Sequence, residues 1–297
     1  MNVGRVDVRR LRILVELSRL GSMRAVAEEL GTTTSTVSQQ VAALAREVGA
    51  ALVEPVGRNV RLTPAGLRLA HHGIGILAAV EAARLDLDPH AEPAGLVAVA
   101  GFASAVRRSL LPVVRDLGTT HPGVQVLIHE YEPIEALDLL AGDDVDLALV
   151  YDYNLAPLSF PADVVATPLW QVDWGLGVPA GEGPRTGTAD LAAYVDRSWI
   201  ANSRNTADED VVRTLASLVG FSPRITHRID SLELVEDLIE DGHGVGLLPM
   251  AWRGGPGVRV LPLAEPGALL RAYAVVRRGR TDWPPLRLLL ERVAEAG

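Results

Sequence analysis

The chain has 297 residues, of which 48% are hydrophobic and 22% are charged, a composition typical of a folded protein with more than one core. No apolar run approaches the roughly 20 residues that span a bilayer, no secretory signal peptide is predicted, and the lack of cysteine excludes disulfides and thiolate metal sites. All 28 basic residues are arginine, which excludes a phosphate-binding P-loop and a lysine nucleophile. Together these features predict a cytoplasmic protein.

The net charge of -9 is unevenly distributed along the chain. Residues 1–70 contain 10 arginines and 6 acidic residues, whereas the remaining 227 residues contain 18 arginines and 31 acidic residues. Positive charge therefore collects at the N-terminal end, where it favours contact with a phosphate backbone. The acidic remainder is expected to lie away from such a partner.

The first 63 residues predict three short helices followed by a pair of strands. Apolar residues at helical spacing form the first helix, which Gly21 ends. Ser22 is a suitable N-cap for the second helix, and Thr33 or Thr34 for a third that ends at Gly49. The two predicted strands are 52–54 and 60–62.

The third predicted helix begins with a cluster of short hydroxyl side chains. Gly31 lies in the tight turn before it, and Val37 and Val41 form its inward face. At the N-terminus of such a helix, hydroxyl and amide groups can reach phosphates and base edges in the major groove. An ordinary capped helix with solvated hydroxyls is the structural alternative. The candidate DNA-contacting residues of this helix are Thr33, Thr34, Ser35, Thr36, Ser38 and Gln39.

A long helix is predicted over 64–87, with two apolar stripes that need more than one packing partner. Its length of roughly 36 Å favours pairing with a second chain over packing only within its own domain. Gly73 and Gly75 permit the close approach of a neighbour. A polar segment punctuated by proline and glycine, 88–95, separates this helix from the rest of the chain.

Beyond residue 95, short apolar strands alternate with helices, which predicts βαβ units, parallel strands and two α/β lobes between which the chain passes more than once. The predicted strands are 96–101, 124–131, 145–150, 199–202, 225–229, 245–248 and 269–277. Ligands of such folds lie at the carboxyl ends of strands, against helix N-termini. Ser104 and Ser231 are equally suited to be helix N-caps alone. The candidate ligand-binding residues are Ala103, Ser104, Ala105, Tyr151, Asp152, Asn202, Ser203 and Ser231.

The motifs that would indicate an enzyme are not found in the sequence. The glycine-rich segment 242–246 follows a helix and precedes a strand, the reverse of the dinucleotide-binding order. His71 and His72 are adjacent on a helix and point about 100° apart, which makes a poor metal pair. Asp143, Asp144 and Asp146 are predicted to form a solvated turn. We expect no catalytic residue, metal or cofactor; a solute-binding protein without a transcriptional role and a DNA-binding module fused to a catalytic domain remain alternatives.

The whole chain resembles the LysR-type transcriptional regulators of bacteria. The opening helices match the family at Leu11, Val15, Gly21, Ser22, Ala25, Ala27, Leu30, Val37, Ser38, Leu44 and Gly49. The wing and the entry to the long helix match at Leu52, Gly57, Arg58, Leu62, Thr63, Pro64, Ala65 and Gly66. The resemblance implies an α/β protein with a mainly helical, winged helix-turn-helix DNA-binding domain at 1–63 and a linker or dimerisation helix and hinge at 64–94. It further implies an effector-binding domain with the two-lobed fold of periplasmic binding proteins at 95–297, with lobe 1 at about 95–165 and 264–297 and lobe 2 at about 166–263.

The same resemblance implies a sequence-specific transcriptional regulator, not an enzyme, that binds operator DNA as a homodimer or homotetramer joined by linker helices. A small-molecule effector between the lobes and RNA polymerase are its expected partners, and Arg58 and Arg61 are the expected DNA contacts of the wing. Ala42 and Pro55 stand where basic residues are usual in the family. We therefore expect the affinity for DNA to depend only weakly on salt. Ala103 and Ala105 likewise replace the hydroxyl residues that are common in the family.

Overall fold

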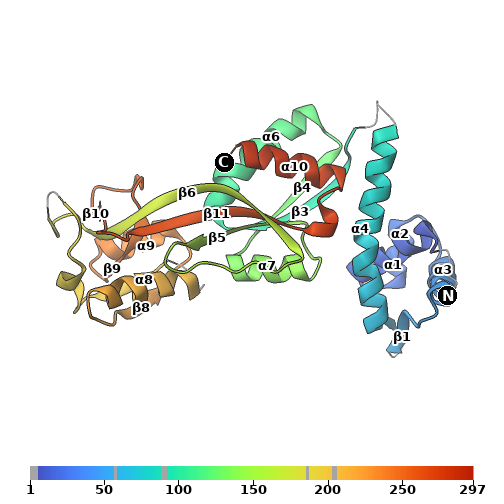
Figure 1. Cartoon of the computed structure of the whole chain (residues 1–297), viewed down its shortest axis with the longest axis horizontal. Coiled ribbons are helices and arrows are strands. Elements are labelled where there is room, and N and C mark those ends of the chain that lie inside the picture. The colour runs from blue at the N-terminus through green and yellow to red at the C-terminus, as the bar shows by residue number, and fades with distance from the viewer. Residues whose placement is uncertain (1–5, 57–58, 88–91, 185–186, 203–205, 297) are drawn as a thin grey trace.

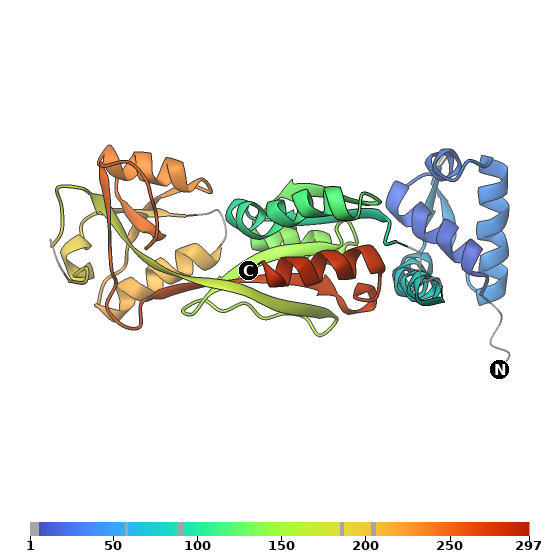
Figure 2. The ribbon, with the colours of Figure 1, turned by 90° about the horizontal axis from the view of Figure 1, so that it is seen from above.

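The computed structural model describes residues 6–56, 59–87, 92–184, 187–202 and 206–296. A small helical unit, the long helix α4 (Pro64–Leu87) and two α/β lobes follow one another along the long axis of the molecule (Figure 1). Figure 2 shows the same order from above. The α/β fold class with an N-terminal helical unit, predicted from the sequence, is confirmed.

Local caps delimit the helices of the N-terminal unit, which we call the head (residues 6–63). Gly21 (φ 68°) and Gly49 (φ 70°) end the first and third helices in the left-handed conformation, which glycine adopts at little cost. Ser22 caps the second helix. Of the two candidate caps of the third helix, Thr33 is the one used, because its hydroxyl accepts a 3.2 Å hydrogen bond from the Thr36 backbone N–H. The helices are α1 (Val8–Leu20), α2 (Met23–Glu29) and α3 (Thr34–Val48).

The wing of the head is an antiparallel pair of strands, β1 (Val53–Val56) and β2 (Asn59–Leu62). The wing leads directly into α4, and the join is close. A Cβ on Gly66 would lie 2.1 Å from the carbonyl oxygen of Leu52, so only glycine lets α4 begin against the wing. The buried core of the head includes Leu11, Leu14, Val26, Val37, Val41 and Leu44.

The two lobes share one sheet, in which nine described strands are joined by hydrogen bonds in the order β4-β3-β5-β11-β6-β9-β7-β8, with β10 beside β6. β3 is parallel to β4 and β5, and β7 to β8 and β9, as the βαβ pattern predicted. β6 and β11 run antiparallel and pass from one lobe to the other, and their pairing is interrupted by a bulge between Ala272 and Tyr273. The strands are β3 (Gly95–Gly101), β4 (Val124–Glu130), β5 (Leu147–Tyr153), β6 (Val164–Pro179), β7 (Ser198–Ala201), β8 (Arg224–Arg228), β9 (Val245–Pro249), β10 (Val258–Leu261) and β11 (Ala268–Arg277).

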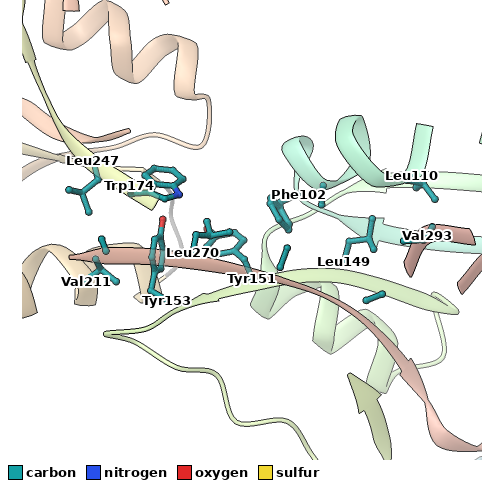
Figure 3. Packing of buried hydrophobic residues seen from close by; sticks show 14 of the residues in the cluster. Phe102, Leu110, Leu149, Tyr151, Tyr153, Trp174, Val211, Leu247, Leu270 and Val293 are labelled. Atoms are coloured by element: carbon teal, nitrogen blue, oxygen red, sulfur yellow. The ribbon is translucent and has the colours of Figure 1, made fainter. Parts of the chain in front are cut away.

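Helices cover this sheet in both lobes, and one apolar core continues between the lobes (Figure 3). Tyr151, Tyr153 and Trp174 belong to the part of the core at the crossing strands. The first helix of lobe 1 contains a π-helical segment, a feature often found at functional sites. The helical segments are α5 (Ala103–Ala105), η1 (Val106–Leu110), α6 (Leu111–Thr120), α7 (Pro133–Ala141), η2 (Leu191–Tyr194), α8 (Thr206–Leu218), α9 (Leu232–Glu240), η3 (Arg278–Arg280) and α10 (Pro284–Glu295).

Two predictions for the segment around β5 are wrong. The strand continues to Tyr153, so Tyr151 and Asp152 lie inside it and not after its end. Asp146 does not lie in a solvated turn: it is buried, forms a 2.9 Å ion pair with Arg280 and accepts a 2.8 Å hydrogen bond from the Ala98 backbone N–H. In both cases the polar residues, Asp152 in the strand and Asp146 before it, bond to residues from distant parts of the chain. Of the helices in the described part, none combines the length and the hydropathy needed to cross a membrane.

Candidate functional site

The N-terminus of α3 presents the predicted hydroxyl cluster at the surface of the head. Thr33, Thr34 and Ser35 are exposed, as are Ser38 and Gln39 on the next turn. The Thr33 hydroxyl oxygen lies 2.8 Å from the hydroxyls of Ser35 and Thr36. Val37, Val41 and Leu44 on the opposite side of α3 are fully buried and fix its orientation on α1 and α2. The helix therefore offers a polar surface whose hydrogen bonds are made within its own first turn.

The wing contributes one described arginine, and it is already paired. Arg61 on β2 lies directly opposite Glu54 on β1, and its guanidinium is 2.6 Å from the Glu54 carboxylate. Both side chains remain largely exposed, at 72% and 41%. Arg58, the other predicted contact of the wing, lies outside the described residues. The charge of Arg61 is thus partly neutralised by Glu54.

Ion pairs of this kind recur over the head. Arg10 pairs with Glu47 of α3, and Arg19 and Arg24 pair with glutamates on their own helices. Four described arginines of the head therefore have a carboxylate neighbour. Such surface pairs are worth about 0–1 kcal/mol each and are screened by salt.

A second polar cluster lies at the junction of the two lobes. The hydroxyl oxygen of Tyr151, on β5, is 2.8 Å from Oε2 of Glu132 in lobe 1 and 2.6 Å from Oδ2 of Asp208 in lobe 2. The hydroxyl of Tyr153 donates a 2.8 Å hydrogen bond to the other oxygen of Asp208. Tyr151, Tyr153 and Asp208 are buried. We call these four residues the junction cluster.

The geometry of the junction cluster favours a bound proton. The Tyr151 hydroxyl carries one hydrogen and faces two carboxyl groups, so it donates to one of them and accepts from the other. Burial raises the pKa of Glu132 to about 7; the hydrogen bond from Tyr151 opposes this shift, and the charges of Asp208, Asp230 and Glu135 add to it. Burial also raises the pKa of both tyrosines well above the usual range, so they stay neutral. Glu132 therefore has a pKa that allows it to be protonated near neutral pH.

Asp152, between the two tyrosines, points to the other face of the sheet. Its carboxylate forms two 2.8 Å hydrogen bonds with the guanidinium of Arg271 on β11 and accepts a third, of 3.0 Å, from the Leu158 backbone N–H. Only 3% of its side chain is exposed. Asp152 thus joins the two central strands β5 and β11.

The other described candidates for ligand binding lie at the ends of strands or the starts of helices. Ser104 is exposed and Ala103 half-buried at the start of α5, whereas Ala105 is fully buried. Asn202 is buried after β7 and donates a hydrogen bond to the Leu247 carbonyl. Ser231 caps α9, accepting a 3.3 Å hydrogen bond from the Leu234 backbone N–H. Ser203 lies outside the described residues.

Three members of the junction cluster, Glu132, Tyr153 and Asp208, were not predicted from the sequence. The alternation in a strand would have placed Tyr153 on the same face as Tyr151, but the strand was predicted to end at residue 150. Glu132 and Asp208 precede or begin helices in different lobes, and nothing local joins them. Within the described ranges, no group of three His, Cys, Asp or Glu side chains is arranged to hold a metal ion.

Comparison with known families accounts for nearly the whole chain. Residues 8–67 match the model of the bacterial regulatory helix-turn-helix protein, lysR family, and residues 90–297 match the LysR substrate binding domain. Among curated relatives, the HTH-type transcriptional regulator IlvR of Caulobacter vibrioides is 29% identical over 310 aligned residues, which cover 98% of this chain and 99% of the relative.

Solved structures share the fold over the full length. A full-length OxyR variant from Pseudomonas aeruginosa superimposes with a TM-score of 0.73 at 21% identity, covering 98% of this chain and 94% of that one. Full-length CbnR in complex with its target DNA superimposes with a TM-score of 0.54 at 20% identity, covering 98% and 100%.

The head and the two lobes correspond to separate domains of one family, in the order that the family requires. A solute-binding protein without a transcriptional role would leave the match over residues 8–67 unexplained, and the relatives are regulators and not enzymes. The protein belongs to the LysR family and is a DNA-binding transcriptional regulator with an effector-binding domain.

Proposed function

We propose that α3 is the recognition helix and binds the major groove of an operator through Thr33, Thr34, Ser35, Thr36, Ser38 and Gln39. The observation that carries this proposal is the exposed N-terminus of α3, whose hydroxyls bond only locally and stand on a fully buried apolar face. These hydroxyls can exchange their mutual hydrogen bonds for bonds to phosphates and base edges without disturbing the core.

The double variant Thr34→Ala/Ser35→Ala tests this role. We expect it to weaken binding to the operator while the unfolding temperature stays close to that of the wild type. Ser18→Ala, an exposed serine on α1, is the matched control and keeps the footprint. An unchanged footprint in the double variant contradicts the assignment.

Arg58 and Arg61 are the proposed phosphate contacts of the wing. Because Arg61 is paired with Glu54, and other arginines of the head have carboxylate neighbours, few counterions are released on binding. Fluorescence anisotropy over a range of salt concentrations should give a shallow slope for a dimeric DNA binder. A steep loss of affinity with salt contradicts this proposal, and Glu54→Gln should make the slope steeper.

Self-association through α4 is proposed from its exposed apolar stripe. Ile76, Val80 and Leu87 are 44%, 46% and 85% exposed and lie at spacings that place them on one side of the helix. Burying this stripe against a second copy would give a dimer, or a tetramer through further contacts, with the heads held at a fixed distance. Ile76→Glu/Val80→Glu should yield monomers in analytical ultracentrifugation, whereas Leu218→Glu, an equally exposed leucine on α8, should not.

The proposed division of the chain is a DNA-binding domain at 1–63, a linker helix and hinge at 64–94 and an effector-binding domain at 95–297, with lobe 2 at about 166–263. The effector is proposed to bind between the lobes, next to the junction cluster, with Ala103, Ser104, Ala105, Asn202, Ser203 and Ser231 at its borders and Tyr151 beneath it. Asp152, also predicted as an effector contact, faces the other side of β5, where it is paired with Arg271. The support is that Glu132 and Asp208, from different lobes, meet at the hydroxyl of Tyr151.

Closure of the lobes around an effector would change the spacing of the heads and the bend of the operator, and with it the recruitment of RNA polymerase in the cytoplasm. A thermal-shift screen of metabolites, with each hit tested for a changed DNA footprint, is the decisive experiment. Compounds that stabilise the protein and alter the footprint support the proposal. Stabilising compounds that leave every footprint unchanged contradict it.

A further inference from the structure

Helix α4 lies between the head and lobe 1 and is approached closely from both (Figure 1). A Cβ on Gly73 would lie 2.9 Å from Cγ2 of Val15 on α1, and a Cβ on Gly75 would lie 2.9 Å from the carbonyl oxygen of Gly279 in η3. Side chains two positions apart on a helix point about 200° away from each other. The two glycines therefore open opposite sides of α4, one to the head and one to lobe 1.

A polar cluster surrounds the contact at Gly75. His71 lies one turn before Gly75 on the same side of α4. The guanidinium of Arg277, at the end of β11, contacts both ring nitrogens of His71: Nη2 lies nearest to Nδ1 and 2.6 Å from Nε2. Arg277 also forms a 2.5 Å ion pair with Asp143, whose other carboxylate oxygen is 3.7 Å from Nδ1 of His71. Three segments that are distant in sequence thus meet at one imidazole ring.

The backbone of Asp143 supports a specific role for this contact. Asp143 has a φ of 63°, and among the described residues it is the only one other than glycine with a positive φ. Aspartate tolerates this conformation better than most residues, but such positions persist only where the surroundings fix them. Here the turn after α7 directs the carboxylate towards both Arg277 and α4.

The contact is not tightly filled. A cavity of about 360 Å³ lies beside it, between α4, η3 and the segments that hold Asp143 and Asp163. The cavity is large enough for water, so the two sides can separate without first breaking a close-packed apolar core. The contact is therefore polar, lies beside a space that can admit water, and is suited to opening.

Arg277 is also connected to the lobe junction. β11 runs from Arg271, which holds Asp152 next to Tyr151, to Arg277 beside α4. Six residues of extended strand span roughly 20 Å. A shift of β11 at the junction can thus reach α4 along one strand, whose pairing with β6 is interrupted at Ala272 and Tyr273.

We propose that His71, Asp143 and Arg277, together with the close approach at Gly75, form a latch that positions the linker helix on lobe 1, and that protonation of His71 opens it. The inference rests on the proposed control of DNA geometry by the effector-binding domain. The latch is the contact through which a movement of β11 reaches α4 and the head, and it adds a proton as a second regulator of that movement.

The chemistry of the imidazole explains the direction of the switch. Neutral His71 accepts a hydrogen bond from Arg277, whereas the imidazolium has only donors and meets a like charge. Burial, followed by the charge of Arg277, lowers the pKa of His71, against the opposing charge of Asp143. The titratable and charged groups that face His71 or line the adjoining cavity are Arg277, Asp143, His72, Asp163, Arg278 and Arg280.

The sign of the pH dependence follows from that shift. The pKa of His71 is lower when the latch is closed than when it is open, so the closed form binds fewer protons. The latch has its full strength above about pH 6.5 and weakens as the pH falls through the pKa of the closed form.

Distance measurements on the intact protein test the latch. The chain has no cysteine, so spin labels can be attached at Arg12→Cys on α1 and Arg115→Cys on α6, with unlabelled protein in excess to suppress distances between chains. At about pH 8 pulsed EPR should show one main distance, and at about pH 5.5 a second, altered distance should appear. His71→Gln, which stays neutral but can still accept from Arg277, should keep the main distance at both pH values.

His72→Gln is the matched control and should respond to pH as the wild type does. Gly75→Ala gives a second, independent variant, which should show the altered distance already at about pH 8 and should change operator bending in a gel-mobility assay. A wild-type distance that does not change with pH, or a His71→Gln variant that responds like the wild type, overturns the proposal. The distance measurements require neither DNA nor effector. The latch can therefore be disproved while α3 still binds its operator, and operator binding can fail while the pH-dependent change in distance is observed.

Discussion

The first turn of α3 and the lobe junction both consist of hydroxyl-centred hydrogen bonds, but they differ in reach and burial. In α3 the partners Thr33, Ser35 and Thr36 lie within three residues of one another and are exposed or half-buried. At the junction Tyr151 bonds to partners 19 and 57 residues away, and it is buried. Local, exposed bonds can be exchanged for bonds to a ligand, whereas buried, distant bonds hold the fold together. The reach of a contact, more than its chemistry, should therefore set the cost of losing it.

The largest loss of stability is expected for Asp152→Ala, which removes a buried carboxylate from a partner 119 residues away. Breaking a buried ion pair from one side typically costs about 3–5 kcal/mol, and the partial exposure of Arg271 places this change at the lower end, about 3 kcal/mol. Denaturant titration measures the free energy of unfolding. Asp144→Ala, an exposed aspartate in the turn before β5, is the control and should stay within about 0.5 kcal/mol of the wild type.

Gly66→Ala should destabilise the head, because Gly66 makes a close contact with a residue that is distant in sequence. The new Cβ would lie 2.1 Å from the Leu52 carbonyl oxygen, so the wing and α4 must move apart. Overpacking of this kind costs about 1–3 kcal/mol, and operator binding should fall with it because the wing is displaced. Thermal unfolding measures the stability of both variants. Gly118→Ala, in α6 with no atom within 4 Å of the new Cβ, should be neutral or slightly stabilising. Equal effects of the two changes would contradict the structural argument.

The proton of the junction cluster predicts a pH dependence of stability. The pKa of Glu132, about 7, is raised above its ordinary value, so between about pH 4.5 and pH 7 the folded chain holds a proton that the unfolded chain has lost. The free energy of unfolding should therefore fall as the pH rises through this range, by at most about 1.4 kcal/mol per pH unit, and level off above it.

Glu132→Gln should flatten that slope, because the amide can donate to the Tyr151 hydroxyl at every pH. Glu130→Gln, an exposed neighbour at the end of β4, should leave the slope intact. A slope that persists unchanged in Glu132→Gln would show that the proton is bound elsewhere.

The smallest effect is expected for Thr33→Ala, which removes the cap of α3. Loss of such a cap costs about 1 kcal/mol, while Thr33→Asn, which can still accept from the Thr36 backbone N–H, should restore most of it. Chemical denaturation compares the two variants. If Thr33→Asn recovers stability but not operator binding, the cap and the DNA contact are separate roles of one hydroxyl.

The same contrast explains what could be predicted from the sequence. Helix ends of the head were predictable because Gly21, Ser22 and Gly49 act through partners in the same or the next turn. The end of β5 was not predictable, because the polar residues Tyr151 and Asp152 are typical of a loop when their partners are unknown.

The partners that bury these polar groups come from far along the chain. Asp146 is satisfied by Arg280, and Asp152 by Arg271, through contacts that no local pattern records. The lobe architecture and helix α3 were therefore predictable, but the junction cluster and the contact at His71 required the folded structure.

The continuity of the sheet has a mechanical consequence. Because β6 and β11 pass through both lobes without a break in the chain, the lobes are joined by a twisted ribbon and not by a free hinge. We expect such a ribbon to resist wide opening and to deform mainly by twisting. The twist should be easiest where the pairing of β6 with β11 is interrupted, at Ala272 and Tyr273. We therefore expect the response of the effector-binding domain to a ligand to be a small rotation of one lobe, transmitted along β11 towards α4.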